Sequence, residues 1–293
     1  MEVSCLPPSP NPKKPAIATP PGACDTHFHL FGPVARFPYA PQRAYTPPEA
    51  PLEALLAMHA RLGFERGVVV QGNAHGTDLS ALLDALKREP QRLRGAAIVV
   101  DTTGRAELQR LADAGVRALR FHHISGVEKA KFSNIGIRAF EKLAPLMADL
   151  GLHVQLLMDS RDLPEVMLSF RNWKLPIVID HLGQTPAVQG INNPGYREMR
   201  RLLAEGRIWV KLSGAYRISK QFPNYADARP FHDGLIAANP DQVVWGSDWP
   251  HPRLAENMPN TGHLLDLFNA WTPDAALRKK ILVENPARLY GFG

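Results

Sequence analysis

The sequence predicts an α/β protein that forms a single (β/α)8 barrel of the TIM type, with an extended proline-rich N-terminal arm. Three observations predict this fold. Short apolar runs rich in β-branched residues alternate with stretches of helical spacing, eight such pairs follow one another, and no linker or shift of composition separates them. The chain has 293 residues, 45% of them hydrophobic and 21% charged, which suits one barrel with a sizeable core.

The N-terminal arm is expected to comprise residues 1–21. Thirteen of the 27 prolines precede residue 52, and seven of them lie within the first 21 residues. Proline lacks a backbone N–H group and disfavours helices and central strands, so this region is predicted to be extended, with a proline-rich loop after it. We therefore divide the chain into the arm, 1–21, and a barrel domain, 22–293.

Eight strands are predicted from the apolar runs, which are short enough for strands and lie at regular intervals. Their ranges are 24–30, 66–72, 94–100, 116–122, 153–158, 176–180, 208–213 and 243–246. The intervening stretches repeat apolar residues at helical spacing, as Leu79, Leu82 and Leu86 do. Thr77 is expected to cap the start of that helix, and Gly151 and Gly206 to end two later helices.

A doubly wound open sheet is the alternative arrangement of the same units. Such a sheet would carry a glycine-rich turn after its first strand if it bound a dinucleotide. The corresponding turn, Leu30 to Pro33, contains only one glycine. The closed barrel is therefore preferred, and NAD is not expected.

The net charge of +6 and the isoelectric point near 9.4 raise the question of nucleic-acid binding. The basic residues do not cluster, because the longest run is the three residues Arg278-Lys279-Lys280 and the others are pairs such as Lys13-Lys14. We expect no nucleic-acid partner. A mild positive field that attracts a small anionic substrate explains the same charge.

The sequence also limits the expected location. It contains no apolar run of the roughly 18 to 20 residues that a membrane helix needs, and no secretory signal is visible at its start. Cys5 and Cys24 are the only cysteines and have no metal-like spacing. We expect a cytoplasmic protein without a membrane partner, either a monomer or a small homo-oligomer.

Histidines gather at the predicted C-terminal ends of the strands, where the reacting groups of a barrel enzyme lie. Seven of the 11 histidines fall at or just after such an end: His27, His29, His75, His122, His123, His181 and His251. Any one of them could be a hydrogen-bonded core residue or a solvated loop residue. Seven on one rim predict a functional site.

The first and last strands carry the two strongest motifs. His27 and His29 belong to Asp-Thr-His-Phe-His, and the two-residue period of a strand places both imidazoles on one face with Phe28 on the other. Asp248 ends the last strand within Gly-Ser-Asp-Trp-Pro-His-Pro. The alternatives are a structural histidine pair and a turn or cap carboxylate.

These motifs, together with Ile-Asp-His-Leu-Gly on strand six, resemble those of the amidohydrolase superfamily. Within it, the chain is most similar to the group of 2-pyrone-4,6-dicarboxylate lactonases and related enzymes that hydrolyse or isomerise lactones. The resemblance extends from Gly22 to the closing Asn-Pro-Ala-Arg-Leu-Tyr, and the three motifs in this order make it specific.

The resemblance implies roles for individual residues. Asp248 would be the general base that activates water, while His27, His29 and His181 would surround and polarise the lactone carbonyl. Tyr45, Arg120 and Arg217 match positions that hold the substrate carboxylates in the lactonase. Further substrate contacts are expected from His75, His122 and His251, which lie at the same rim.

The chain departs from the dicarboxylate lactonase at three positions. That enzyme has a further arginine where this chain has Gly126 or its neighbours, and a tyrosine on strand five where this chain has Leu156 or Leu157. It has another arginine where this chain has Gln184. This chain therefore lacks three donors to a second substrate carboxylate. The resemblance implies the carbonyl chemistry but does not identify the lactone.

The residue types are compatible with that mechanism. A carboxylate with a reference pKa near 4 is ionised at pH 7 and can accept a proton from water. Imidazole N–H groups can donate to the oxygen that becomes negative. Arginine suits a carboxylate through its planar fork, although Arg120 could instead pair with a neighbouring strand, and Arg217 and Tyr45 could be solvent-exposed. Lys211 is expected to face the interior and to pair with Asp180 or Asp248, in a structural role.

Zinc is the alternative to a metal-free site. His27, His29, His181 and Asp248 could bind one zinc ion, which would lower the pKa of its water to about 7. Strand five offers no histidine near its C-terminal end, and strand four offers no lysine or glutamate ligand. We therefore expect no cofactor.

The leading hypothesis is hydrolysis of a carboxylated lactone of aromatic catabolism, such as 2-pyrone-4,6-dicarboxylate or a muconolactone-like compound. The next is a hydrolase or isomerase of sugar-acid lactones such as galactarolactone, which would use hydroxyl partners such as Asn73, Ser213 and Gln184. A zinc-dependent decarboxylase and a non-catalytic anion-binding barrel remain as further alternatives.

Overall fold

The computed structural model describes residues 3–123 and 136–293. Eight parallel strands form one sheet in the order β10-β9-β8-β7-β6-β5-β4-β2. Their bounds are β2 (Cys24–Phe28), β4 (Arg66–Val70), β5 (Leu93–Ala97), β6 (Val116–His123), β7 (His153–Met158), β8 (Ile177–Ile179), β9 (Trp209–Lys211) and β10 (Val243–Val244). Each lies within or nearly within one of the predicted runs, so the eight-strand prediction is confirmed.

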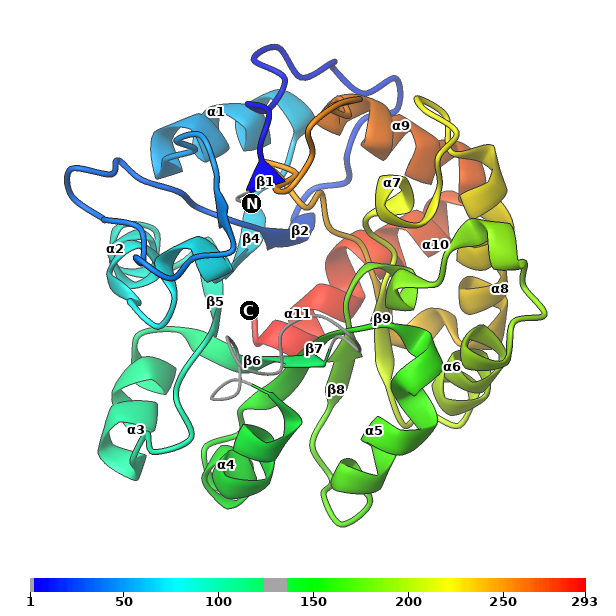
Figure 1. Ribbon diagram of the computed structural model, residues 1–293. Coiled ribbons are helices and arrows are strands. Elements are labelled where there is room, and N and C mark those ends of the chain that lie inside the picture. The colour runs from blue at the N-terminus through cyan, green and yellow to red at the C-terminus, as the bar shows by residue number, and fades with distance from the viewer. Residues whose placement is uncertain (1–2, 124–135) are drawn as a thin grey trace.

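The sheet closes into a barrel between its first and last strands. Thr26 N–H donates to the Trp245 carbonyl over 3.1 Å, and Phe28 forms a parallel bridge with Trp249. Figure 1, which looks along the barrel, shows the strands as a ring with helices around it. The doubly wound alternative is therefore wrong.

The outer ring is built by amphipathic helices between successive strands. The longer ones are α1 (Leu52–Leu62), α2 (Ser80–Arg88), α3 (Arg105–Asp113), α4 (Ile137–Asp149), α5 (Leu163–Phe170), α6 (Pro194–Ala204), α8 (Arg229–Ala238) and α9 (Thr261–Trp271). Short helices include α7 (Ala215–Ile218), α10 (Ala275–Lys279) and α11 (Asn285–Tyr290). Among the described residues, none of the helices combines the length and apolar character needed to cross a membrane.

Local capping explains where several helices start and stop. The side chains of Asn193 and Asn260 accept backbone N–H groups at the starts of α6 and α9. Gly151 and Gly206 follow α4 and α6 with φ of 65° and 72°, as expected of helix stops. The expectation for Thr77 is wrong, because α2 begins at Ser80, whose N–H is bound by the Asp78 carboxylate instead.

The strands separate two packed regions. Phe28, Phe121 and Leu156 point outward into the main apolar layer beneath the helices. Inside the barrel, Cys24 and Val68 pack with Tyr290 and Phe292, so α11 and the residues after it close one end. The other end, where the strands finish, carries the polar side chains.

The N-terminal arm lies against the barrel. Its first strand, β1 (Val3–Ser4), pairs with β3 (Tyr45–Thr46), and Leu6 N–H donates to the Leu254 carbonyl over 2.7 Å. Further along, the Lys13 ammonium pairs with the Asp266 carboxylate at 2.7 Å. Figure 1 shows this segment in dark blue, running between α1 and α9.

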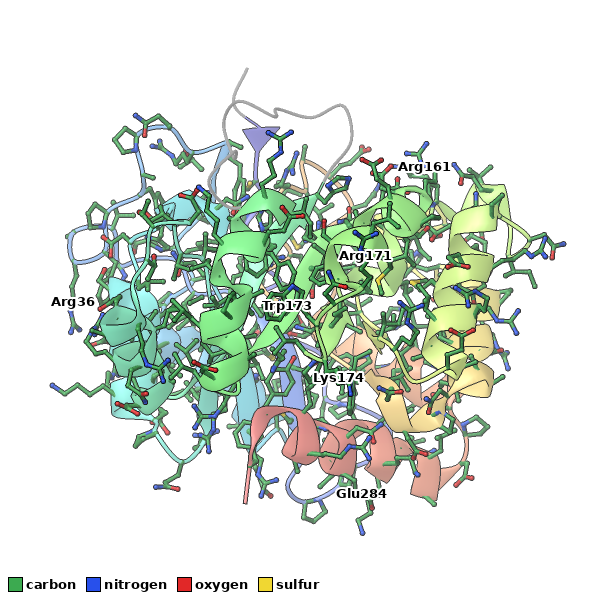
Figure 2. The ribbon with its side chains drawn as sticks, turned by 90° about the horizontal axis from the view of Figure 1, so that it is seen from below. Arg36, Arg161, Arg171, Trp173, Lys174 and Glu284 are labelled. Atoms are coloured by element: carbon green, nitrogen blue, oxygen red, sulfur yellow. The ribbon has the colours of Figure 1, made fainter. Side chains whose placement is uncertain are left out.

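Basic side chains are spread over the outside of the molecule. In the view of Figure 2, Arg36, Arg161 and Lys174 lie in separate regions of the surface. Arg36 pairs with Asp84 and Arg161 with Asp159. This distribution agrees with the absence of a basic cluster in the sequence.

Candidate active site

Four side chains from distant parts of the chain meet at the C-terminal end of the barrel. Asp248 Oδ1 lies 3.7 Å from His27 Nε2 and 3.4 Å from His29 Nε2, and its Oδ2 lies 3.8 Å from His181 Nδ1. The rings of His27 and His181 are 4.4 Å apart. All four side chains are buried. The structure thus brings together the four residues that the motifs predicted to be catalytic.

The Gly-Ser-Asp motif has a packing reason as well as a chemical one. A Cβ atom on Gly246 would lie only 2.6 Å from the Cβ atom of His27, so glycine permits the close approach of β2 and the segment after β10. The Ser247 hydroxyl then donates to Asp25 Oδ2 over 2.5 Å, and its N–H donates to Oδ1 over 2.8 Å. Asp25 therefore helps to hold the last strand, and Asp248 with it, against the first.

The backbone is strained at two of the four residues. His181 and Asp248 have φ of 53° and 60°, in the left-handed region that costs a residue with a side chain roughly 1 to 3 kcal/mol. A hydrogen bond of 2.7 Å from Asp248 N–H to the His27 carbonyl holds the second of these turns. Both side chains are thereby turned from their strand ends toward the barrel axis.

The two oxygens of Asp248 have different surroundings. Oδ2 accepts the Tyr216 hydroxyl and Arg217 Nε–H, each over 2.5 Å. Oδ1 is buried and has no hydrogen-bond partner within residues 3–123 and 136–293. Burial by itself would raise the pKa of this carboxyl, but the Arg217 guanidinium and the nearby imidazoles outweigh burial and hold the pKa well below its usual range. Asp248 is therefore ionised at neutral pH.

The histidines are neutral at neutral pH because burial disfavours the imidazolium form. Burial lowers the pKa of His27 well below its usual value, assisted by the Lys211 ammonium, and lowers that of His29 as well. It lowers the pKa of His181 to about 3. His181 Nδ1 is also 2.9 Å from the Ser213 hydroxyl.

Lys211 and Asp180 form a second group of buried polar side chains, next to His27. Lys211 Nζ is 3.5 Å from Asp180 Oδ1 and donates to the Thr26 carbonyl over 3.0 Å. The predicted pairing of Lys211 with Asp180 is thus confirmed. Burial alone would raise the pKa of Asp180, but Lys211, His27 and Arg120 together hold it well below its usual range.

Arg120 and Arg217 both lie at the site, and both bind carboxylates of the chain. Arg120 donates through Nε and Nη2 to Asp180 Oδ2 over 3.3 and 3.1 Å, and through Nη1 to the Gln71 carbonyl over 3.1 Å. Arg217 uses its Nε–H group on Asp248. Two N–H groups of Arg120 and the Nη groups of Arg217 take no part in these bonds. Arg217 is therefore not merely solvent-exposed, and Arg120 forms the ion pair that was its alternative.

Three other predicted substrate residues, Tyr45, His122 and His75, have different surroundings. Tyr45 is buried on β3, and burial raises its pKa to about 12 despite the positive charges of Arg120 and Arg217. His122 Nδ1 is 3.2 Å from the Asn73 amide, and His75 packs on Phe31 in an aromatic group.

His251 lies behind the Asp248 carboxylate. Its Nδ1 is 3.3 Å from the Tyr216 hydroxyl, and its Nε2 is 3.0 Å from the Thr261 hydroxyl. Because Tyr216 donates to Asp248, His251 supports the donor that orients the base. Its contact with the substrate stays a prediction.

The departures from the lactonase pattern can be placed at two of three positions. On β7, Gln155 faces the interior and donates to Asp180, while Leu156 packs outward, so the two-residue period makes Leu157 the residue that faces the barrel mouth. Gln184 ends the short helix η4 (His181–Gln184) and is partly buried. Gly126 lies outside the described residues.

Two side chains that help to hold Asp248 in place, those of Tyr216 and Asp25, were not predicted from the sequence. Tyr216 immediately precedes Arg217 on α7, and nothing in its spacing marks it. Asp25 opens the Asp-Thr-His-Phe-His motif, and its place at the start of that motif was an available signal. Both bind residues more than 30 positions away in the sequence, which a local pattern does not reveal.

The site offers ligand atoms for a small cation. One atom each from His27, His29 and Asp248 lie within 4.8 Å of one another, and a second such group is His27, Asp180 and His181. The unpartnered Oδ1 of Asp248 and the adjacent Nε2 atoms fit a metal such as zinc in ligand type. Residues that could bind a metal are thus present.

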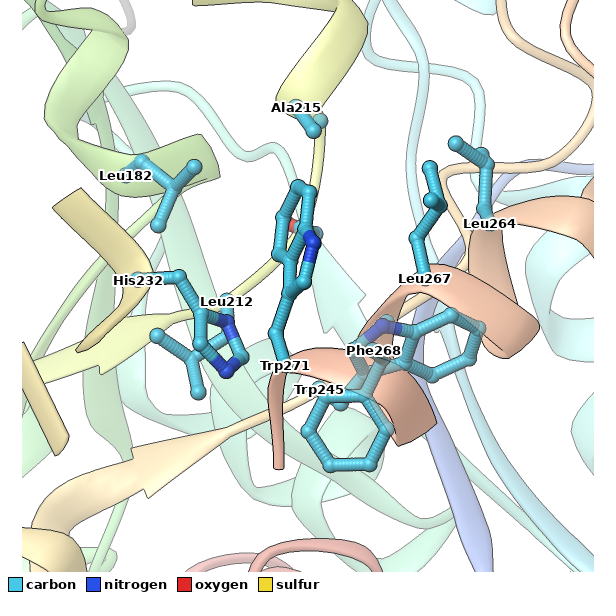
Figure 3. Close-up of a pocket in the computed structure, with 12 residues that line it drawn as sticks. Leu182, Leu212, Ala215, His232, Trp245, Leu264, Leu267, Phe268 and Trp271 are labelled. Atoms are coloured by element: carbon cyan, nitrogen blue, oxygen red, sulfur yellow. The ribbon is translucent and has the colours of Figure 1, made fainter. Parts of the chain in front are cut away.

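A small cavity lies beside the site, between the ends of β9 and β10 and helices α8 and α9 (Figure 3). Its walls are mainly apolar and include Leu212, Trp245, Phe268 and Trp271. The His232 imidazole faces it but is held by the Thr272 hydroxyl at 2.9 Å. None of the four converging residues lines this cavity, so it is separate from the candidate active site.

The chain is similar to known proteins along nearly its whole length. The family model described as Amidohydrolase matches residues 24–292. The chain is 38% identical to a 2-pyrone-4,6-dicarboxylate hydrolase of Comamonas testosteroni, over 96% of this chain and 93% of that protein. It is 40% identical to a 4-sulfomuconolactone hydrolase of Rhizobium radiobacter, over 94% of this chain and 92% of that protein.

A solved structure shows the same fold. It is a probable 2-pyrone-4,6-dicarboxylic acid hydrolase of Acinetobacter baumannii with citric acid bound, and it superposes with a TM-score of 0.78 at 26% sequence identity. The superposition covers 92% of this chain and 100% of that chain.

Proposed function

Because the chain belongs to the amidohydrolase family, we propose that its site hydrolyses a lactone that carries an anionic group, as in aromatic catabolism. The chain is an enzyme of the lactonase kind. Its relatives from Comamonas testosteroni and Rhizobium radiobacter are named for a pyrone dicarboxylate and a sulfomuconolactone, both anionic lactones.

One observation carries this proposal: the Asp248 carboxylate is ionised and buried, with one oxygen held by donors and the other unpartnered beside the imidazoles. A general base needs an acceptor oxygen within about 3 Å of the proton that it removes. Oδ1 is such an oxygen. Tyr216 and Arg217 hold the carboxylate in place through Oδ2, so that Oδ1 can receive a water proton without rotation of the side chain.

The reaction then has a simple course. Water gives a proton to Asp248 Oδ1 as its oxygen bonds to the lactone carbonyl carbon. Imidazole N–H groups stabilise the negative carbonyl oxygen of the tetrahedral intermediate, and the loss of one such donor typically costs about 3 to 4 kcal/mol. When the ring C–O bond breaks, the proton on Asp248 passes to the leaving oxygen, and the carboxylate is restored.

Arginine and tyrosine side chains at the mouth would hold the substrate's anionic group. Arg217 has Nη groups beyond its Nε bond to Asp248, so it can bridge the base and a substrate carboxylate. Arg120, Tyr45, His75 and His122 are proposed as further contacts. The citric acid bound to the Acinetobacter baumannii protein is also a carboxylate ligand.

The contacts favour a lactone bound mainly through its anionic group over a sugar-acid lactone bound mainly through its hydroxyl groups. The Ser213 hydroxyl already binds His181, and the Asn73 amide already binds His122. Two of the three hydroxyl partners expected for a sugar-acid ring are therefore engaged, whereas the guanidinium groups retain N–H donors.

We propose that this chain needs no metal for the reaction. The Arg217 guanidinium on Asp248 and the Lys211 ammonium on His27 already supply positive charge, and a divalent cation between them would be repelled. If zinc binds, His27, His29 and Asp248 would hold it, and it would lower the pKa of a bound water. A cytoplasmic location and a monomeric or small oligomeric state are proposed as well, the former because two cysteines 19 residues apart suggest no disulfide framework.

A lactone panel tests the proposal. Proton release is followed for pyrone dicarboxylate, muconolactones, sulfomuconolactone and sugar-acid lactones, with and without chelator, and the metal content of the purified protein is measured. The proposal predicts turnover of an anionic lactone that survives chelation. Stoichiometric zinc whose removal abolishes turnover would contradict the metal-free reaction, and failure to open any lactone would contradict the function.

A further inference from the structure

The two histidines of the first strand have different hydrogen-bond partners on their Nδ1 atoms. His29 Nδ1 is 2.7 Å from the Val70 carbonyl oxygen. A carbonyl oxygen can only accept, so His29 carries its proton on Nδ1. A neutral imidazole has one N–H group, so His29 Nε2 is an acceptor, and its 3.4 Å contact with Asp248 Oδ1 is not a hydrogen bond.

This assignment determines the proton position on His27. His27 Nε2 lies 3.4 Å from His29 Nε2 in hydrogen-bond geometry. Since His29 Nε2 accepts, His27 Nε2 must donate. Two neutral imidazoles with their Nε2 atoms in contact are compatible only when one is a donor and the other an acceptor.

The contact of the other ring nitrogen of His27, Nδ1, independently indicates the same tautomer. Lys211 Nζ is 3.2 Å from His27 Nδ1 in hydrogen-bond geometry. An ammonium group can only donate, so His27 Nδ1 is the acceptor. Asp180 Oδ1 is also near, at 3.3 Å, but the Lys211 ammonium is 3.5 Å from the same oxygen and is the charged donor for it. Lys211, which is fully buried, is thus the group that binds this nitrogen.

We propose that Lys211 is a positioning residue that sets the tautomer of His27, so that the two histidines of the motif carry their protons on different nitrogens. His27 presents an N–H donor to the cavity, and His29 presents a lone pair. The consequence for catalysis rests on the proposed function. In that reaction His27 is the imidazole that donates to the carbonyl oxygen of the lactone, and His29 is an acceptor for the attacking water.

Lys211 is needed because of Asp180. Without the ammonium, the only charged group beside His27 Nδ1 in the described structure is the Asp180 carboxylate, which can only accept. The His27 proton would then move to Nδ1, and Nε2 would lose its ability to donate. The buried lysine prevents a carboxylate–histidine pair that would present the wrong nitrogen to the substrate.

The tautomers can be measured directly. The full-length protein is labelled with 15N-histidine and examined by long-range proton–nitrogen correlation at pH 7, with His27→Gln and His29→Gln variants to assign the signals. We expect Nε2 to be the protonated nitrogen of His27 and Nδ1 that of His29. A spectrum with His27 protonated on Nδ1 overturns the proposal, whether or not the protein opens a lactone.

Two matched variants test the role of Lys211. Lys211→Met and Lys211→Gln remove the same charge and have similar side-chain lengths, but only glutamine keeps an N–H donor. We expect Lys211→Met to move the His27 proton to Nδ1 and to lower kcat by a factor on the order of 10² or more, with KM changed much less. Lys211→Gln should keep the Nε2 proton and most of kcat.

Thermal unfolding of both variants is measured beside their activity, and Lys142→Met on the surface is the control for loss of a lysine. If the two variants lose kcat equally while the His27 tautomer stays unchanged, Lys211 acts only through its charge or the fold, and the proposal is wrong. Should Lys211→Met fail to fold, the wild-type spectrum still decides the tautomers, and the kcat of Lys211→Gln decides the need for a donor.

Discussion

The Nε–H group of Arg217 donates to Oδ2 of Asp248 over 2.5 Å, while Oδ1 of the same carboxylate has no partner in the described part of the chain. The bond makes the two oxygens unequal, because one is committed to orientation and the other is available for proton transfer. It also ties Asp248, the proposed base, to a residue that is proposed to bind the substrate anion. In the proposed function, substrate binding and water activation are therefore linked through one guanidinium group.

Replacement of the base should nearly abolish turnover. In Asp248→Asn the amide oxygen can still accept from Tyr216 and Arg217, so the fold should persist, but an amide cannot take a proton from water. We expect kcat to fall by at least about 10³. Steady-state kinetics on the best lactone of the panel measure this change, and Asp84→Asn on the surface is the control. A loss of less than tenfold would remove Asp248 from the role of base.

Activity should depend on pH in a way that Arg217 controls. Asp248 must be deprotonated, and its lowered pKa places the acid limb of kcat/KM below about pH 4, with no limb near neutral pH from His181, whose pKa burial lowers to about 3.

In Arg217→Met the main influence that lowers the Asp248 pKa is lost while burial, which raises it, remains. The acid limb should then move upward, and kcat/KM at pH 7 should fall at least about tenfold. An acid limb that stays in place in the variant would show that Arg217 does not control the base.

Loss of Arg120 should weaken the binding of anionic lactones. Arg120→Met removes N–H donors at the barrel mouth but leaves Lys211 as a partner for Asp180. We expect KM for a carboxylated lactone to rise about tenfold and KM for an uncharged lactone to change little. Arg161→Met, on the surface, is the matched control. An equal rise for both lactones would point to a change of the fold rather than a lost carboxylate contact.

Gly246 should not tolerate a side chain. The Cβ atom of alanine would stand 2.6 Å from the Cβ atom of His27, so His27 or the strand must move. We expect Gly246→Ala to lower the free energy of unfolding by about 1 to 3 kcal/mol and kcat by up to about 10². Urea unfolding and kinetics measure the two effects. Gly104→Ala is the control, because its added Cβ would meet no atom within 4 Å.

A buried histidine outside the site should make stability depend on pH. Burial lowers the pKa of His232 to about 3, while an unfolded histidine titrates near 6.5. Between these values the unfolded state binds the extra proton, so the stabilisation is complete above about pH 6.5 and declines by up to about 1.4 kcal/mol per pH unit as the pH falls toward 3.

The variant His232→Gln should reduce the slope of unfolding free energy against pH, measured in urea between pH 7 and 5. His263→Gln is the control, because the His263 side chain is not fully buried. Equal slopes in wild type and His232→Gln would contradict the prediction.

Local patterns were enough to predict the barrel and the position of its chemistry. The eight apolar runs became the eight strands because alternation and length are properties of neighbouring residues. The two-residue period placed His27 and His29 on one face and Phe28 in the outer layer. The common direction of parallel strands then brought Asp248 and His181 to the same rim.

Individual side-chain contacts and orientations were not predictable in this way. The start of α2 was misplaced at Thr77, because Asp78 supplies the N-terminal hydrogen bond that threonine was expected to make. Solvent exposure was the alternative for Arg217, yet α7 turns it onto Asp248. Either Leu156 or Leu157 could have faced the barrel mouth until the orientation of β7 selected Leu157.

The amino-acid sequence by itself determined which residue types reach the open end of the barrel, since strand period and strand direction are set along the chain. Only the tertiary structure decided which oxygen of Asp248 is unpartnered and which nitrogen of His27 faces Lys211. Those properties depend on distances of a few ångströms between residues as far apart as 27 and 211, and hydrogen bonds are sensitive to such distances while sequence patterns are not.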